Sequence, residues 1–394
     1  MSGQPQNPFA NLPMPGQSEL GRPSPGGGAG GSKPAAMTRF TPLTFSGTGL
    51  QLFGIQILNM FLTMLTLGLW TPWARVRKRR FFYSNTRILD EGLDYLATGF
   101  DIFKGWVIVT LIFAIYYVIP ILLPVPFLEY LLVLVLLFVY PWALNRSFRF
   151  NARNIAWRDV RFDFNGSYLG SLWYFFILPL IGLLSVGLLM PLASKAMRDY
   201  VARCYSFGTA NFSSDSSVLS YYGAGIKTLI LSGILMVPLV AAVYLVIYDL
   251  AMQYVAGGLT APSVEQIMEE PAIGAIFIMA PVGLYFLFTI TVSYYQALTR
   301  NIMVNTLRLQ GGIRFRSTLS GFVLAWIMLT NLILIVISLG LLLPWTQVRR
   351  YRYLTERTEI RPIGDLNGFL DRQVKAGSSI GDAVGEAGGL EITF

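Results

Sequence analysis

The stretch SLGLLLPWTQVRRYRY, residues 338–353, decides how this chain is interpreted, because the chain contains two further versions of it. TLGLWTPWARVRKRRFFY occupies residues 66–83, and SVGLLMPLASKAMRDY occupies residues 185–200. All three share the pattern [ST]-[LV]-G-L-x-x-P-[WL], in which a glycine precedes a proline by four residues. A protein that ends three apolar segments in the same way contains internal repeats.

The composition places these repeats in a membrane protein. Of the 394 residues, 54% are hydrophobic and 13% are charged, whereas a soluble domain carries roughly 25% charged residues. The net charge of +9 comes from basic residues that follow apolar runs, which fits the positive-inside rule and argues against nucleic acid as a partner. The chain has one cysteine and no histidine, so we expect no internal disulfide, no histidine-based catalysis, no metal site and no cofactor.

Seven apolar segments predict an all-α fold, that of a polytopic α-helical membrane protein. Each is long enough, or nearly so, for a helix to cross about 30 Å of hydrocarbon. The segments run approximately over residues 50–71, 105–125, 127–143, 169–191, 226–248, 272–298 and 321–343. Residues 1–37 are rich in Gly, Pro, Ser and Gln and predict a disordered tail. Residues 362–394 predict a polar C-terminal tail.

The repeats divide the transmembrane domain, residues 38–361. Three repeats cover about 40–95, 160–212 and 313–361, and two hairpins, 105–143 and 226–298, lie between them. A partial fourth copy, YPWALNRSFRF at residues 140–150, and a weaker fifth, QALTRNIMVNT at residues 296–306, end segments of these hairpins. A short alternating stretch that ends near glycine precedes each of the three main copies: PLTFSGTG, VRFDFNGS and IRFRSTLSG.

Each copy contains residues that break a helix. Proline disfavours the helical conformation in the residue before it and suits the first turn of a new helix. We therefore expect each apolar helix to stop at the membrane surface and a basic, amphipathic piece to lie along the cytoplasmic headgroups. The helix-breaking residues are Gly68, Pro72, Gly187, Pro191, Gly340 and Pro344.

The residues that follow each break are candidate lipid contacts. Tryptophan prefers the headgroup level, and a cation near an anionic leaflet contributes about 1 kcal/mol. The candidates for contacts with lipid phosphates and the interface are Trp73, Trp345, Arg77, Arg80, Arg349 and Arg352. The alternative is that these residues are only a topological anchor. The middle copy departs from the pattern, with Leu192 in place of tryptophan and Asp199 among its basic residues.

Charge also predicts the topology. The positive-inside rule places the basic loops and the C-terminal tail in the cytoplasm. Segments 169–191 and 321–343 are basic on both flanks, so a single crossing would put one basic flank outside. Either the rule is violated there or these segments enter and return on the same side. We favour single crossings, because most apolar segments of this length cross a membrane, and keep re-entry as the alternative.

Few polar residues lie within the apolar segments. Asn59 and Asn331 occupy matching positions in the first and last segments and are candidates to line a cavity, although polar residues in membrane helices more often join one helix to another. No nucleophile–base pair or phosphate-binding loop stands out, so we expect the protein not to be an enzyme.

Two long stretches carry a family resemblance. FSGTGLQLFGIQILNMFLTMLTLGLWTPWARVRKRRFFYSNTRI and LSGFVLAWIMLTNLILIVISLGLLLPWTQVRRYRY resemble the YjgN family of bacterial inner-membrane proteins, also called DUF898. The similarity covers roughly residues 40–360. The resemblance implies a multi-pass protein of the inner (cytoplasmic) membrane and brings no known activity with it.

Two functions fit these features. The first is a transporter, channel or lipid-handling helical bundle, because transporter folds often contain internal repeats. The second is a membrane scaffold that anchors or regulates a partner protein, such as an envelope protease, through its basic pieces and tails. We expect membrane lipids with anionic headgroups to be partners in either case.

Overall fold

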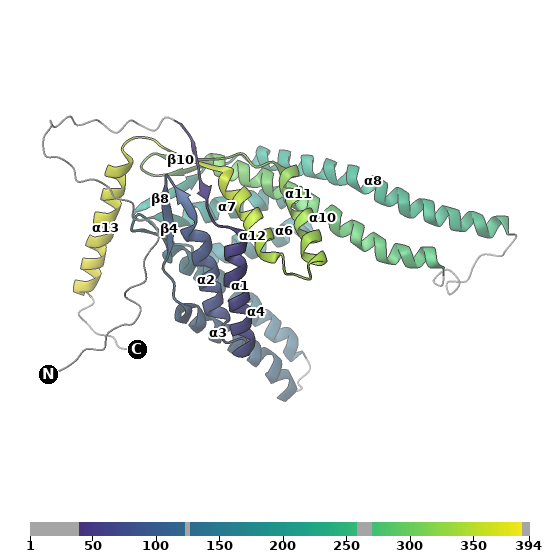
Figure 1. Ribbon diagram of the computed structural model, residues 1–394, viewed down its shortest axis with the longest axis horizontal. Coiled ribbons are helices and arrows are strands. Elements are labelled where there is room, and N and C mark those ends of the chain that lie inside the picture. The colour runs from purple at the N-terminus through teal and green to yellow at the C-terminus, as the bar shows by residue number, and fades with distance from the viewer. Residues whose placement is uncertain (1–38, 123–126, 258–269, 388–394) are drawn as a thin grey trace. The chain divides into compact units, whose positions relative to one another are not determined.

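A computed structural model describes residues 39–122, 127–257 and 270–387 of the chain, so the predicted N-terminal tail lies outside the described residues. The helices, most of which are labelled in Figure 1, are α1 (Gly49–Leu65), α2 (Thr71–Ser84), α3 (Gly99–Leu122), α4 (Leu128–Arg153), α5 (Tyr168–Leu172), a π-helical turn (Trp173–Ile177), α6 (Leu178–Leu184), α7 (Met190–Cys204), α8 (Val218–Ala256), α10 (Pro271–Thr306), α11 (Gly321–Ile337), α12 (Leu343–Glu356) and α13 (Leu366–Ala387). The strands are β1 (Thr41–Pro42), β2 (Thr44–Phe45), β3 (Thr86–Ile88), β4 (Glu91–Tyr95), β5 (Ile155–Trp157), β6 (Val160–Phe164), β7 (Tyr205–Phe207), β8 (Ala210–Ser214), β9 (Leu307–Leu309), β10 (Ile313–Ser317) and β11 (Thr358–Pro362).

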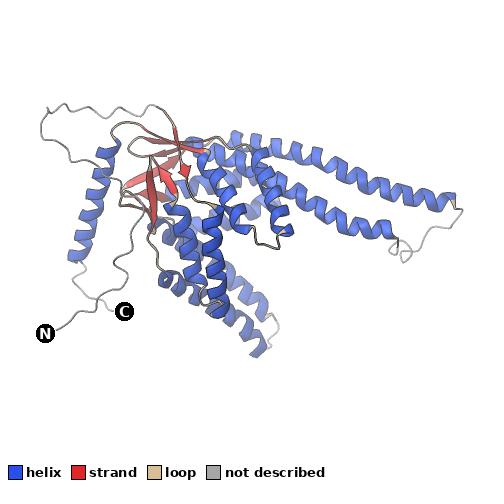
Figure 2. Cartoon of the chain, in the orientation of Figure 1, coloured by secondary structure: helices blue, strands red, loops and turns tan. Residues whose placement is uncertain are grey.

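Among the described residues, four helices are long and apolar enough to cross a membrane, which agrees with the predicted helical membrane protein. These candidate spans are Gly99–Ile119, Tyr130–Arg153, Val218–Gln253 and Pro271–Thr306. They form two pairs, because α3 packs against α4 and α8 packs against α10. The prediction of an all-α fold is wrong, since the helices alternate with short strands that form an 11-stranded antiparallel sheet (Figure 2).

The sheet closes on itself through the first described residues. Its two outermost strands, β1 and β2, are separated only by Leu43. On one side Thr41 pairs with Ile360 of β11, and on the other Thr44 pairs with Arg87 of β3. Residues 41–45 therefore act as one bent strand that joins the last strand of the chain to the first hairpin and completes a ring.

Five copies of one structural unit build this ring. Each unit has two helical segments followed by two antiparallel strands, the second of which leads into the next unit; in the last unit this second strand comes from the start of the chain, where β1 pairs with β11. Units 1 to 4 comprise residues 49–95, 99–164, 168–214 and 218–317, and unit 5 comprises residues 321–362 together with 41–45. Helices of neighbouring units pack against each other, and α12 of unit 5 packs against α1 of unit 1. The hairpins that separate the sequence repeats are thus the helix pairs of units 2 and 4.

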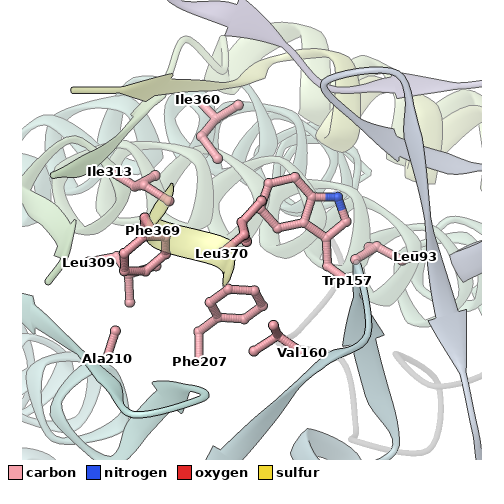
Figure 3. Close-up of a cluster of buried hydrophobic side chains, with 10 residues drawn as sticks. All are labelled: Leu93, Trp157, Val160, Phe207, Ala210, Leu309, Ile313, Ile360, Phe369 and Leu370. Atoms are coloured by element: carbon pink, nitrogen blue, oxygen red, sulfur yellow. The ribbon is translucent and has the colours of Figure 1, made fainter. Parts of the chain in front are cut away.

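Apolar side chains from the strands meet α13 inside the ring (Figure 3). The cluster consists of Phe369 and Leu370 of α13 together with one residue from each of the strands β4 to β11: Leu93, Trp157, Val160, Phe207, Ala210, Leu309, Ile313 and Ile360. Phe369 and Leu370 are each 4% exposed. Gln373 of α13 accepts hydrogen bonds from the backbone nitrogen and the hydroxyl of Thr209, at 2.7 and 2.8 Å. The predicted C-terminal tail therefore contributes its first helix to the core.

The three sequence repeats form the short helix pairs of units 1, 3 and 5. A single crossing would place the two ends of each pair on opposite sides of a membrane. However, β2 pairs with β3 around the first short pair, β6 pairs with β7 around the second, and β10 pairs with β11 around the third. Both ends of every short pair therefore join the same sheet, so the favoured single-crossing interpretation is wrong. The re-entrant alternative agrees with this connectivity.

Candidate functional site

The Ser or Thr of the repeated pattern lies in the turn between the two helices of each short pair. The hydroxyl of Thr66 donates to the carbonyl oxygen of Leu62 at 2.8 Å and accepts from the backbone nitrogen of Trp70 at 3.0 Å. Ser185 and Ser338 make comparable bonds on both sides of their own turns. One hydroxyl thus satisfies backbone groups at the end of the first helix and in the turn.

The glycines of the pattern reverse the direction of the chain. Gly68, Gly187 and Gly340 have φ angles of +92°, +83° and +88°. Nothing lies within 4 Å of a Cβ added at any of the three, so glycine is required there for its left-handed backbone and not for space.

The prolines of the pattern begin the returning helix. Pro72, Pro191 and Pro344 lie in the first turn of α2, α7 and α12, and each of these helices packs against the helix before the turn. The expectation that the basic segment lies along the headgroups is therefore wrong, because the two left-handed residues before each proline fold the chain back along the preceding helix.

The tips of the short pairs are apolar. The residue before the glycine is almost fully exposed in each turn: Leu67 at 95%, Val186 at 93% and Leu339 at 94%. An apolar side chain in this position at three equivalent tips is suited to hydrocarbon and not to water.

Asn59 and Asn331 join the two helices of their own pairs. Both are 6% exposed. The side-chain oxygen of Asn59 accepts from Arg77 at 3.5 Å, and that of Asn331 accepts from Arg349 at 3.4 Å. At the matching positions of unit 3 the chain has Leu178 and Ala196, relative to Pro191. Unit 3 therefore has apolar residues at both positions of the Asn–Arg pair.

The two selected tryptophans lie where neighbouring units meet. The ring of Trp345 occupies the space beside Gly49 at the start of α1, and the ring of Trp73 occupies the space beside Gly99 at the start of α3. Trp345 also contacts the ring of Phe53, with 5.1 Å between centroids. Both tryptophans therefore fill contacts between units, whatever their depth in a membrane.

Arg80 and Arg352, the other two candidate lipid contacts, differ in their bonding. Arg352 donates to the carbonyl oxygen of Gly47 at 2.9 Å and helps to close the ring between units 5 and 1. Arg80 is exposed, and no other described residue binds its guanidinium group. The role of the four arginines as lipid-phosphate contacts stays a prediction, and only Arg80 is without a competing partner among described side chains.

A groove of 490 Å³ opens at the contact between units 5 and 1, which we call the seam. Its walls are one face of α1, one face of α2, and the turn before α12 with the first residues of that helix. The lining residues are Phe53, Gln56, Ile57, Asn59, Met60, Thr63, Met64, Thr71, Ala74, Arg75, Lys78, Gly340, Leu341, Leu343, Pro344 and Gln347. Most of this lining is apolar, and its size lies within the usual range for small-molecule sites.

Two cations stand on one wall of the seam groove. Arg75 is exposed and Lys78 is partly buried. Across the groove, Gln56 of α1 donates to Gln347 of α12 at 2.9 Å. Because Lys78 is farther from the tip than Met64 or Leu341, the groove has a charged end toward the sheet and an apolar end toward the tips.

Sequence reasoning missed Arg75 and Lys78. Thr71, Ala74, Arg75 and Lys78 have the spacing of residues on one face of a helix, so the chain does contain a signal. That signal does not reveal which element lies opposite this face of α2, because α12 begins more than 260 residues after Lys78 in the chain.

Comparison with known proteins extends this description. The profile of a family described as "Bacterial protein of unknown function (DUF898)" matches residues 40–387. The chain belongs to this family. It is 27% identical to the inner membrane protein YjgN of Salmonella typhimurium over 83% of this chain and 89% of that protein. It is 25% identical to YjgN of Escherichia coli strain K12 over 82% of this chain and 88% of that protein. No solved structure matches the chain.

The names of these relatives and the structure both indicate a membrane location. Both are named inner membrane proteins, and the described chain has four candidate spans. The chain is therefore an inner membrane protein of the DUF898 family, for which no activity is indicated.

Proposed function

We propose that this protein is a non-enzymatic, lipid-handling membrane protein that binds an anionic lipid in the seam groove. The observation that carries the proposal is the distribution of groups along the groove, with Lys78 toward the sheet, Arg75 nearer the middle, and Met64 and Leu341 at the tips. A phospholipid has the same distribution, with a charged phosphate joined to apolar chains. Cations at phosphate depth attract anionic headgroups by about 1 kcal/mol each.

The depth of the groove supports a lipid from one leaflet. Lys78 is seven residues from Thr71, the first residue of α2, which corresponds to about 10 Å along a helix. Half of the hydrocarbon core measures about 15 Å. With the ammonium of Lys78 at the headgroups, the apolar tips would lie near the middle of the bilayer. We therefore place the bound lipid in the leaflet next to the sheet.

The order of the units supports the seam as the site. Long pairs in units 2 and 4 alternate with short pairs in units 1, 3 and 5. Because the ring contains an odd number of units, two short pairs must be neighbours at one place, and that place is the seam. All residues that line the groove belong to these two short pairs. We place the sheet and the C-terminal helix on the cytoplasmic side, in accordance with the basic loops.

Lipid retention by the purified protein tests the proposal. Native mass spectrometry of the full chain would compare phosphatidylglycerol with phosphatidylcholine. The double variant Arg75→Gln/Lys78→Gln should retain at least tenfold less phosphatidylglycerol. The control Arg87→Gln/Arg161→Gln, which removes two exposed positive charges outside the groove, should behave like the unmodified chain.

Two results would contradict lipid binding in the groove. Equal losses in both double variants would indicate general attraction to a basic surface, and no loss in either would leave the groove without a lipid. In the second case the scaffold alternative, in which the basic face holds a partner protein, becomes the better account.

A further inference from the structure

Unit 3 departs from its neighbours in a buried polar cluster at the contact with unit 4. At the position eight residues after the repeated proline, units 1, 2 and 5 have Arg80, Arg149 and Arg352, whereas unit 3 has Asp199. Asp199 is 5% exposed. Such a buried carboxylate requires partners that compensate its charge.

Each oxygen of the Asp199 carboxylate accepts a hydrogen bond. Lys195, one turn earlier on α7, donates to one oxygen at 2.7 Å. Ser216, just before α8, donates to the other oxygen at 2.8 Å. Within the part of the chain that the structure describes, the one buried carboxylate of this cluster is therefore paired with Lys195 and Ser216.

The neighbouring Arg198 has a donor without an acceptor. One terminal nitrogen donates to the hydroxyl of Thr299 on α10 at 2.8 Å. Its Nε is buried and has no hydrogen-bond partner. Buried donors are almost always satisfied in proteins, so an acceptor that belongs to no described residue is expected beside this nitrogen.

A second unpartnered group lies in the same cluster. Tyr221 of α8 is fully buried, at 0% exposure, and its hydroxyl forms no well-aligned hydrogen bond, although the side chain of Ser216 lies within its reach. It lies close enough to Arg198 and Asp199 to interact with both electrostatically. The hydroxyl and the Nε can each donate one hydrogen bond. Two donors from two different helices thus lack acceptors at the same interface.

The cluster also carries more positive than negative charge. Arg198 acts electrostatically on Arg300 of α10. Among the described residues, the Arg300 guanidinium binds only neutral acceptors, the carbonyl oxygen of Leu354 at 3.2 Å and the hydroxyl of Thr358 at 3.1 Å. Lys195 is paired with Asp199. Asp215, the next carboxylate along the chain, is exposed and forms no ion pair with a described residue. Two guanidinium groups therefore remain uncompensated, and the desolvation of such charges is costly.

We propose that the interface of units 3 and 4 binds a phosphate-like oxyanion, with the Nε of Arg198 and the hydroxyl of Tyr221 as donors. Arginine suits this ligand because its planar, permanently charged group donates several hydrogen bonds to oxyanions. Lys195, whose side chain is 22% exposed, marks the side from which the anion can enter. The site is independent of the seam groove, which units 5 and 1 form.

The oxyanion has two sources, free phosphate in the cytoplasm or the phosphate of a lipid headgroup. Arg198 lies eight residues after Met190, the first residue of α7, or about 12 Å along the helix from the tip. This depth is close to that of Lys78 in unit 1, so both sources can reach it. The experiment must therefore include a separate measurement for each source.

Thermal unfolding of the purified full chain tests the site. Sodium phosphate would be titrated against sodium chloride at constant ionic strength, and the protein would separately be compared in phosphatidylcholine bilayers with and without phosphatidylglycerol. The account predicts that phosphate, phosphatidylglycerol or both raise the unfolding midpoint. Arg198→Gln and Tyr221→Phe should each weaken this response at least tenfold in ligand concentration, whereas Arg203→Gln, which removes an exposed charge from the same helix, should leave it unchanged.

A measurement without oxyanions provides a second readout. In chloride alone, Arg198→Gln should be at least as stable as the unmodified chain, because the substitution removes an uncompensated charge. A response to phosphate only identifies a free anion, and a response to phosphatidylglycerol only identifies a headgroup. No specific response in either arm, or an undiminished response in both Arg198→Gln and Tyr221→Phe, would overturn the proposal. Loss of lipid retention in the seam groove variants would not bear on this result.

Discussion

Trp345 of unit 5 packs beside Gly49 of unit 1 and fills the space that a side chain on residue 49 would need. The same relationship joins Trp73 of unit 1 to Gly99 of unit 2. The contact that closes the ring thus repeats a contact between units that are consecutive in the chain. Ring closure in this protein therefore uses the ordinary interface of the repeat.

Substitution of Gly49 tests the closing contact. Gly49→Ala would push a methyl group into the ring of Trp345, and overpacking of this kind costs about 1–3 kcal/mol. We expect a lower unfolding midpoint in detergent. Gly54→Ala, on the same helix where nothing lies within 4 Å of the added Cβ, should be neutral or slightly stabilising. Equal effects of the two substitutions would refute the contact.

The left-handed turn of the last short pair predicts that substitutions of Gly340 differ in how much they destabilise the protein. Its φ of +88° is unfavourable for alanine, which should lower the free energy of unfolding by about 1–2 kcal/mol. Asparagine visits left-handed conformations more readily, so Gly340→Asn should cost less. Denaturant unfolding of both variants measures this order, and a better-tolerated alanine would argue against the described turn.

A double-mutant cycle tests the polar link within unit 5. Asn331→Leu and Arg349→Ala should each lower stability, by about 1–3 kcal/mol where a buried group loses its partner. The double variant imitates Leu178 and Ala196 of unit 3 and should cost less than the sum of the single variants by at least about 0.5 kcal/mol. Strictly additive effects would show that the two side chains do not interact.

The docking of α13 in the sheet ring predicts a large effect at Phe369. Phe369→Ala would remove a buried aromatic ring from the core cluster, at a cost of about 3–5 kcal/mol. Val374→Ala on the same helix, where the valine is 43% exposed, should change stability by less than about 0.5 kcal/mol. Limited proteolysis of the C-terminal region offers a direct comparison, since only the Phe369 variant should be cut faster.

The repeats were predictable because their signal is local. Glycine and proline four residues apart recur with the same Ser or Thr, and the structure places all three copies in equivalent turns. The partial copies at residues 140–150 and 296–306 lie at the ends of the second helices of units 2 and 4. The stretches VRFDFNGS and IRFRSTLSG contain β6 and β10, so alternation marked these strands although it did not identify them.

The sheet and the seam groove were not predictable for a physical reason. Strands of two to five residues are too short for alternation to be distinctive, and pairs such as Thr41 with Ile360 join the two ends of the chain. The direction of the chain after each turn depends on two left-handed residues that no hydrophobic pattern specifies. Arg75 and Lys78 were part of the basic run, but only the position of α12 reveals that they line a groove.

The central claim is that the short helix pairs enter and leave the membrane on the side of the sheet. Single cysteines at Ser46, Arg87 and Gly257, introduced into a Cys204→Ser background, would be tested with an impermeant thiol reagent on whole cells. Ser46 and Arg87 flank the first short pair, and Gly257 follows the long helix α8. The account predicts that cysteines at 46 and 87 stay protected until the cells are opened, while the cysteine at 257 reacts in whole cells. Reaction of only one of positions 46 and 87 in whole cells would contradict the account.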